Sequence, residues 1–236
     1  MNAVPRLRAR ALEAAFLGVR TYHRLRPTTP AGRGGRPVFR VAPGTIALTI
    51  DDGPDPRWTP AVLDLLAAHG VPATFFLIGD RVAEHPALAR RIADAGHEIG
   101  NHSMRHPMPF AALPSGLINA EIGQAQRRIT DATGTAPRLF RAPSGGWSAN
   151  VLAATADAGL TPVDWTVNSS DWKEPGVGRV TRALARSGSG HVLLCHDGGG
   201  DRSQTVAALS VVIPRLLRRG LRFVAVPAHP AAGRET

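Results

Sequence analysis

The stretch TIALTIDDGP, residues 45–54, places two adjacent aspartates where a strand gives way to a turn. Residues 45–50 are β-branched or apolar, which is typical of a strand covered on both faces. Gly53 and Pro54 are turn residues, so the strand ends at Asp51 and Asp52. Neighbouring carboxylates repel each other, and a plain surface turn is the alternative reading. The pair, after an apolar strand, favours a functional site.

Six further β-rich runs follow, with helix-type sequences between them. The runs are residues 73–78, 97–101, 138–142, 161–167, 191–196 and 222–226. One helix is predicted over residues 59–70, with Thr59 as its cap and Gly70 at its end. Strands alternating with helices predict parallel pairing. We expect an α/β fold with about seven parallel strands, either a (β/α) barrel or an open doubly wound sheet.

The charge of the chain is concentrated in its first residues. Residues 1–40 hold nine arginines and one acid, and so carry +8 of the formal net charge of +10. No aromatic-interleaved basic patch accompanies this charge, so we expect no nucleic-acid partner. No run approaches the ~18 apolar residues of a spanning helix, so no integral membrane segment is predicted. The single cysteine, Cys195, excludes an intrachain disulfide.

Residues 6–25 read as a basic amphipathic helix, and residues 28–37 as a linker. The helix could cap the domain, lie on a membrane surface or act as an atypical export signal. As a signal peptide it is poor, because Glu13 interrupts its apolar part, and on sequence alone a cytoplasmic location is indicated. We expect a basic helix and linker over 1–40, the main domain over 41–230 and a tail over 231–236.

Polar residues gather at the carboxyl ends of the predicted strands, where parallel α/β folds bind ligands. His102 and His106, in HSMRH, are four residues apart, a spacing that lets two imidazoles bind one metal ion. Asp52 supplies a third ligand, which completes a zinc set of the catalytic type with an open position. Asp51 is then free to act as a base on water.

Other strand ends carry candidate acid–base groups. In HVLLCHD, alternation sends Leu194 and His196 to one face and Cys195 to the other, where it is inert. His196 is a candidate general acid, and Asp171 is expected to accept its ring hydrogen. Arg141 is expected to hold Asp51 by a bidentate ion pair.

Three tryptophans, Trp147, Trp165 and Trp172, are candidates for stacking on sugar rings. Burial in the core is the alternative for each of them.

Five motifs in order, TIDDGP, HSMRH, RAPSG, WTVNSSDW and LCH, resemble those of the polysaccharide deacetylases of carbohydrate esterase family 4, the NodB homology domain. The resemblance covers about residues 40–227. It implies a deformed (β/α) barrel, one divalent metal ion, usually zinc, and the removal of acetyl groups from sugars.

The resemblance also implies a role for each motif residue. Asp51 is the base and Arg141 orients it, while Asp171 and Trp172 support the acid His196. Asp52, His102 and His106 are the metal ligands. The expected substrate-binding residues are Pro143, Gly145, Trp147, Trp165, Trp172 and Leu194, the last lining a pocket for the acetyl methyl group.

The chain departs from the family pattern at Ser144, Thr166 and Asn168, which puts substrate preference in question. We expect a hydrolase that deacetylates N-acetylated sugars of the chitin-oligosaccharide or peptidoglycan type. An inactive carbohydrate-binding barrel and an O-acetyl esterase acting on xylan are the alternatives. A glycosidase using Asp51 and Asp52 would leave the histidine pair without a role. Members of the family are often exported, so a cell-envelope location remains open.

Overall fold

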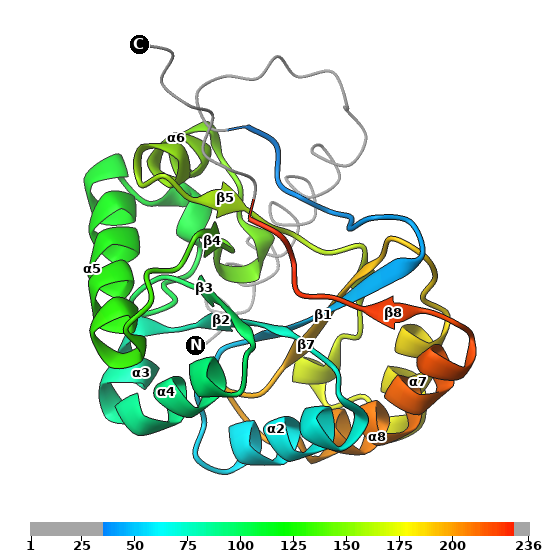
Figure 1. Cartoon of the computed structure of the whole chain (residues 1–236). Helices are drawn as coiled ribbons and strands as arrows, with labels where there is room; N and C mark the ends of the chain where they lie inside the picture. Colours follow the sequence, from blue (N-terminus) through cyan, green and yellow to red (C-terminus); the bar gives the residue numbers. More distant parts are fainter. Residues whose placement is uncertain (1–34, 229–236) are drawn as a thin grey trace, which may run out of the picture.

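The computed structural model describes residues 35–228, and these residues form one curled sheet surrounded by helices (Figure 1). The strands are β1 (Thr45–Asp51), β2 (Thr74–Leu77), β3 (Glu98–Asn101), β4 (Leu139–Phe140), β5 (Thr161–Pro162), β6 (Val167–Asn168), β7 (Val192–His196) and β8 (Arg222–Phe223). Seven follow the order β5-β4-β3-β2-β1-β7-β6, and β8 pairs with β1. Every pair of strands is parallel, which confirms the predicted α/β fold and its deformed barrel.

Seven α-helices and three short 3₁₀ helices connect these strands in the described part of the chain. The α-helices are α2 (Trp58–His69), α3 (Gly79–Glu84), α4 (Pro86–Asp94), α5 (Ser115–Thr133), α6 (Ala149–Asp157), α7 (Val177–Ala185) and α8 (Ser203–Arg218). The 3₁₀ helices are η1 (Phe110–Ala112), η2 (Pro143–Gly145) and η3 (Asp171–Lys173). In Figure 1 the helices lie outside the sheet, with α2 beside α8.

The predicted strand over residues 161–167 is two strands at opposite edges of the sheet, so this prediction was wrong in detail. β5 pairs with β4, and β6 pairs with β7. The residues between them cross from one edge to the other, and Val38 forms a parallel bridge with Val163 inside this crossing. One run of β-rich sequence therefore joins both edges, and this closes the sheet toward a barrel.

Side-chain alternation in β1 and β7 separates an outer core from the inside of the barrel. Ile46, Leu48 and Ile50 pack in the hydrophobic cluster shared with the helices. Ala47 belongs to the inner cluster, and Asp51 follows on the same face of β1. In β7, Leu194 lies in the inner cluster and Cys195 in the outer one, as predicted. Burial raises the pKa of the Cys195 thiol far above its ordinary value, so this cysteine is inert.

The start of α2 differs from the prediction, because Thr59 lies inside the helix rather than at its cap. The Asp55 carboxylate accepts hydrogen bonds from the backbone N–H groups of Arg57 and Trp58 instead. Thr59 is thereby free to donate to Asp197. Gly70 ends the helix with φ 61°, as expected.

The predicted basic helix over residues 6–25 and the tail over 231–236 lie outside the described residues. Within residues 35–228, no helix has the length and apolar character needed to cross a membrane.

Candidate active site

The register between β1 and β7 brings the first catalytic candidates together. Asp51 is the direct partner of His196, and Thr49 is the partner of Leu194. Side chains at paired positions of parallel strands point to the same face, here the inside of the barrel. Both Asp51 and His196 are buried. The two candidates for base and acid therefore lie side by side at the carboxyl ends of neighbouring strands.

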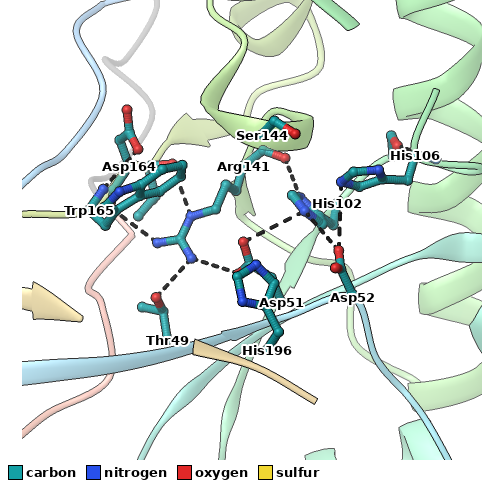
Figure 2. A network of polar contacts seen from close by, with 12 residues as sticks. Thr49, Asp51, Asp52, His102, His106, Arg141, Ser144, Asp164, Trp165 and His196 are labelled. Atoms are coloured by element: carbon teal, nitrogen blue, oxygen red, sulfur yellow. Dashed lines mark hydrogen bonds and ion pairs between the residues drawn. The ribbon is translucent and has the colours of Figure 1, made fainter. Parts of the chain in front are cut away.

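Arg141 directly follows β4, and its side chain extends to Asp51 at the end of β1 (Figure 2). Its Nη1 donates to Asp51 Oδ1 at 2.7 Å and to Thr49 Oγ1 at 2.8 Å. Its Nη2 donates to the carbonyl of Asp164 at 3.1 Å, and its Nε to that of Val163 at 3.4 Å. The predicted bidentate pair is thus wrong. One nitrogen holds Asp51, because backbone carbonyls occupy the others.

Asp52, His102 and His106 form a compact group at the same end of the barrel (Figure 2), with ligand atoms all within 4.8 Å of one another. Nε2 of His102 lies 3.5 Å from Asp52 Oδ1, and Nε2 of His106 lies 3.6 Å from the same oxygen. This oxygen is buried and has no hydrogen-bond partner. The three residues predicted as metal ligands therefore converge around one buried acceptor.

The tautomer of His102 suits metal binding. Its Nδ1 lies 2.7 Å from the carbonyl oxygen of Arg141, which accepts a hydrogen bond from Nδ1–H. Its Nε2 then carries the lone pair and faces Asp52. Arg141 thus contributes to both halves of the site, through its side chain to Asp51 and through its carbonyl to His102.

The ligand loops adopt uncommon backbone conformations. Asp52, Ser103 and His106 have φ values of 75°, 69° and 55°, in the left-handed region. The side chain of Ser103 accepts the backbone N–H of His106 at 3.0 Å, which fixes the turn between the histidines. A Cβ on Gly198 would lie 2.1 Å from the carbonyl oxygen of Asp52, so only glycine fits there.

The charge states of this cluster suit a cation. Burial on its own would raise the pKa of Asp52, but its contact with His102 and the charges of His196, His102 and His106 lower it overall. Burial and the neighbouring His102 lower the pKa of His106, although Asp52 and Asp51 oppose them. An ionised carboxylate and a neutral imidazole are the forms that bind metal ions.

Asp171, at the start of η3, holds His196. Asp171 Oδ1 lies 2.7 Å from His196 Nδ1, and Oδ2 accepts the backbone N–H of His196 at 2.8 Å. Ser169 and Thr205 also donate to this carboxylate. Burial would lower the pKa of His196, but Asp171, with the charges of Asp52 and Asp51, raises it to about 9. The imidazole is therefore kept in its protonated form with Nε2 free.

Two buried carboxylates near the site were missed by the sequence analysis. Glu121 on α5 accepts from the backbone and the side chain of Arg105, inside HSMRH. Asp197 follows His196, accepts from Thr59 Oγ1 at 2.6 Å, and its Oδ1 lies against Gly53. The position of Asp197 directly after a strand was an available signal. Glu121 falls in the middle of a helix, where no pattern distinguishes it.

The predicted substrate-binding residues separate into buried and exposed ones. Trp147 and Trp165 are 2% and 3% exposed and belong to hydrophobic clusters, so the prediction that they stack on sugars was wrong and the alternative of burial holds. Trp165 instead lies beside the guanidinium of Arg141 at 5.6 Å. Pro143, Gly145 and Leu194 are also buried. Trp172, 49% exposed on η3, is the one of the three tryptophans available to a ligand.

Comparison with known proteins shows which family has a similar sequence and fold. The family model described as polysaccharide deacetylase matches residues 40–163. A chitooligosaccharide deacetylase from Bradyrhizobium sp. (strain ANU 289) is 46% identical over 196 residues, 78% of this chain and 89% of its own length. The crystal structure of a peptidoglycan N-acetylglucosamine deacetylase in complex with an N-oxidanyl-benzamide superposes with a TM-score of 0.77 at 35% identity, covering 84% of this chain and 94% of that one.

A pseudoenzyme of carbohydrate esterase family 4 from Bacillus anthracis has the same fold, with a TM-score of 0.76 at 32% identity, covering 84% of this chain and 68% of that one. The fold therefore does not by itself guarantee turnover.

A parallel barrel that carries a candidate metal site of two histidines and one aspartate at the carboxyl ends of its strands has the arrangement of a hydrolase. The chain belongs to the polysaccharide deacetylase family.

Proposed function

We propose that this protein removes acetyl groups from N-acetylated sugars of an oligosaccharide or polysaccharide and releases acetate, with a zinc ion held by Asp52, His102 and His106. The observation that carries the proposal is that the candidate ligand cluster lies next to a second pair of residues, Asp51 and His196, at the carboxyl ends of β1 and β7. Relatives that are 46% and 35% identical to this chain are named as deacetylases of chitooligosaccharides and of peptidoglycan N-acetylglucosamine.

Zinc fits the three donor groups. Two neutral imidazoles and one carboxylate are a catalytic zinc set, and Asp52 Oδ1 is a buried acceptor whose partner would be the ion. A divalent ion bound there supplies Lewis-acid chemistry, polarising the acetyl carbonyl and making water a better nucleophile.

Two residues of the chain accept and donate the protons of the reaction. Asp51, held in place by the hydrogen bond from Arg141, takes a proton from the attacking water. His196, held protonated by Asp171, donates a proton from Nε2 to the leaving nitrogen of the amide. The products are acetate and a free amino sugar. The two roles are separated by environment, since a guanidinium faces one group and a carboxylate faces the other.

The experiment below also tests two alternative functions, an inactive carbohydrate-binding barrel and an O-acetyl esterase. In an inactive carbohydrate-binding barrel we would expect the acid–base pair to be incomplete, whereas here both members are present and oriented. An O-acetyl esterase would use the same metal and base but would not need a protonated His196, because an alkoxide is a better leaving group than an amine anion.

The test is acetate release from purified protein, with and without added zinc. Chitin oligosaccharides, peptidoglycan and acetylated xylan form the substrate panel. We expect zinc-dependent release from the N-acetylated substrates and little from xylan. Binding of the sugars without any release would support the inactive barrel, and release from xylan alone would support the esterase.

A further inference from the structure

The charges of the main domain are unevenly distributed along the chain. Residues 177–228 hold eight basic and two acidic residues, whereas residues 41–176 hold ten basic and fourteen acidic ones. The two acids of the first group, Asp197 and Asp201, both follow β7 at the carboxyl end of the sheet. Helices α7 and α8 and strand β8 therefore carry arginines with no acidic residue among them.

Six exposed arginines lie together at the opposite end, where the strands begin. Nη1 of Arg219 donates to the carbonyl of Ala185 at 2.9 Å, which joins the ends of α8 and α7 (Figure 1). Arg222 pairs with Thr45, the first residue of β1. We call these six residues, in the last turns of α7 and α8, directly after them and at the start of β8, the basic end: Arg182, Arg186, Arg215, Arg218, Arg219 and Arg222.

None of the six arginines of the basic end forms an ion pair within residues 35–228. On α4, by contrast, Arg90 and Arg91 pair with Asp94 and Asp64, each at 2.8 Å. The helix dipole favours arginine in a last turn, but it leaves a group of like charges uncompensated. A surface of this kind attracts a partner that presents many negative charges.

Apolar side chains are exposed beside these arginines. Val211, one turn before Arg215 on α8, is 50% exposed, and Leu217, next to Arg218, is 37% exposed. The phenyl ring of Phe223 is buried, so residues 177–228 offer no phenylalanine, tyrosine or tryptophan on which nucleic-acid bases could stack. A bilayer that contains anionic phospholipid suits this surface, because its headgroups attract arginines and its interface accepts aliphatic side chains.

We propose that the basic end docks the protein on the surface of a bilayer that contains anionic phospholipid. The sequence ahead of the described residues supports this occupant. Residues 1–34 hold seven arginines and one acid, with Leu12, Phe16 and Val19 at helical spacing. They join the chain shortly before Arg40, which forms a bridge with His191 directly before β7.

The docked orientation follows from the fold. The basic end lies where the strands begin, and the candidate active site lies where they end. The site is therefore directed away from the bilayer and stays open to a substrate in the aqueous phase. Docking does not depend on which reaction the site performs.

The test compares two full-length double variants of equal net charge. Arg182→Gln/Arg215→Gln changes the basic end, and Arg127→Gln/Arg128→Gln changes exposed residues of α5, which Figure 1 shows apart from α7 and α8. Glutamine keeps the helix propensity. Co-sedimentation with phosphatidylcholine vesicles, with and without phosphatidylglycerol, measures the partition coefficient at several salt concentrations.

We expect wild-type protein to bind the vesicles that contain phosphatidylglycerol, more weakly as the salt concentration rises, and to leave pure phosphatidylcholine unbound. Removing two charges that face an anionic surface should lower the partition coefficient about 10- to 30-fold in Arg182→Gln/Arg215→Gln. The α5 variant should stay close to wild type. Melting temperatures check the fold, and Arg186→Gln/Arg218→Gln repeats the test if the first variant is destabilised.

Several results would overturn the proposal. Wild-type protein that ignores phosphatidylglycerol has no such docking surface. An equal loss in both variants would mean that net charge, or the segment over residues 1–34, holds the protein on the vesicles. Tighter binding to duplex DNA than to the anionic vesicles at the same salt concentration would assign the basic end to a nucleic acid. Oligomers in light scattering that Arg182→Gln/Arg215→Gln dissociates would assign it to a second copy of the chain.

Discussion

Glu121, buried on α5, accepts hydrogen bonds from both the backbone and the side chain of Arg105, which directly precedes His106 of the ligand cluster. Its Oε2 accepts the backbone N–H at 2.8 Å, and its Oε1 contacts the guanidinium at 2.6 Å. The Glu121 side chain is 3% exposed and that of Arg105 is 56% exposed. The loop that carries His102 and His106 is therefore anchored to the helical layer by one buried carboxylate.

Replacing Glu121 should weaken metal binding although it contacts no ligand. Glu121→Ala leaves the N–H of Arg105 without a partner, and we expect zinc affinity to fall about 10- to 100-fold, as for other outer supports of metal sites. Glu121→Gln keeps an acceptor for that N–H and should lose less affinity. Chelator competition measures the affinity. If Glu121→Ala lowers the melting temperature and leaves zinc affinity intact, the residue supports the fold only.

Substitutions of the adjacent residues Asp51 and Asp52 should impair the protein in two different ways. Asp52→Ala removes a ligand, so zinc should be bound poorly and activity should return, at best, with excess metal. Asp51→Asn keeps the ligand set, so it should bind zinc as wild type does and lose most turnover, because an amide cannot accept a proton from water. Zinc stoichiometry and acetate release are measured on both proteins. A metal-free Asp51→Asn, or one with wild-type turnover, contradicts this division of roles.

His196 should set the alkaline limb of the pH profile. The proposed mechanism requires a protonated His196, whose pKa is raised to about 9, so activity should fall as the pH rises toward that value. Asp171→Asn removes the main influence that raises this pKa, and the limb should move toward the ordinary value of 6.5. His196→Ala should lower turnover of an unactivated acetamide by about 10² to 10⁴.

Two observations would contradict that assignment. A lower maximum in Asp171→Asn with an unmoved alkaline limb would mean that Asp171 only supports the structure around His196. Near wild-type turnover of the acetamide by His196→Ala would mean that another group protonates the leaving nitrogen. The matched substrate is a phenyl acetate ester, whose leaving group needs no proton, and its hydrolysis by His196→Ala should fall far less.

The sequence predicts the strands and the residues at their ends because both follow local rules. β1 and β7 alternate inner and outer side chains over five or more residues, so the faces of Asp51 and His196 follow directly. Residues 161–167 break this rule because they pair at two edges of the sheet, with β4 and with β7, and no local pattern specifies distant partners.

The supports of the site are harder to predict than its ligands. Glu121 lies 16 residues from Arg105 in the chain, and its contact depends on how α5 packs. Arg141 was correctly paired with Asp51, but its other nitrogens bind carbonyls of the crossing segment, which only the closed barrel brings near. Trp147 and Trp165 lie in or next to the site motifs, which suggested contact with the substrate. The folded chain buries both side chains, and their sequence positions do not reveal this.

Residues 1–36 should be dispensable for catalysis. Within the described residues, Val38 and Arg40 form bridges to Val163 and His191, so a truncation that begins at Pro37 keeps these contacts. We expect the truncated protein to retain the zinc stoichiometry and acetate release of the full chain. A control truncation at Gly44 removes both bridges and should lower the melting temperature. Loss of metal or activity in the first truncation would show that residues 1–36 are needed to complete the domain.

Asp197 should make the metal-free protein less stable as the pH rises. Burial and the charges of Asp52, Asp55 and Asp51 raise the pKa of Asp197 from its ordinary value of 3.8 to about 7, against the hydrogen bond from Thr59. Between these pH values the folded protein holds a proton that the unfolded chain has lost. The contribution of this group to the free energy of unfolding therefore decreases as the pH rises, and the loss is complete above about pH 7.

Asp197→Asn cannot ionise and should remove this dependence. The free energy of unfolding of the variant, relative to wild type, should rise by about 1–3 kcal/mol between pH 5 and pH 8. Urea denaturation of both chelator-treated proteins at the two pH values measures it. Asp131→Asn, at an exposed position of α5, is the matched control and should show no comparable change. A difference for Asp197→Asn that is equal at both pH values would mean that the Asp197 carboxyl group does not hold its proton at pH 5, against the burial and negative charges that surround it.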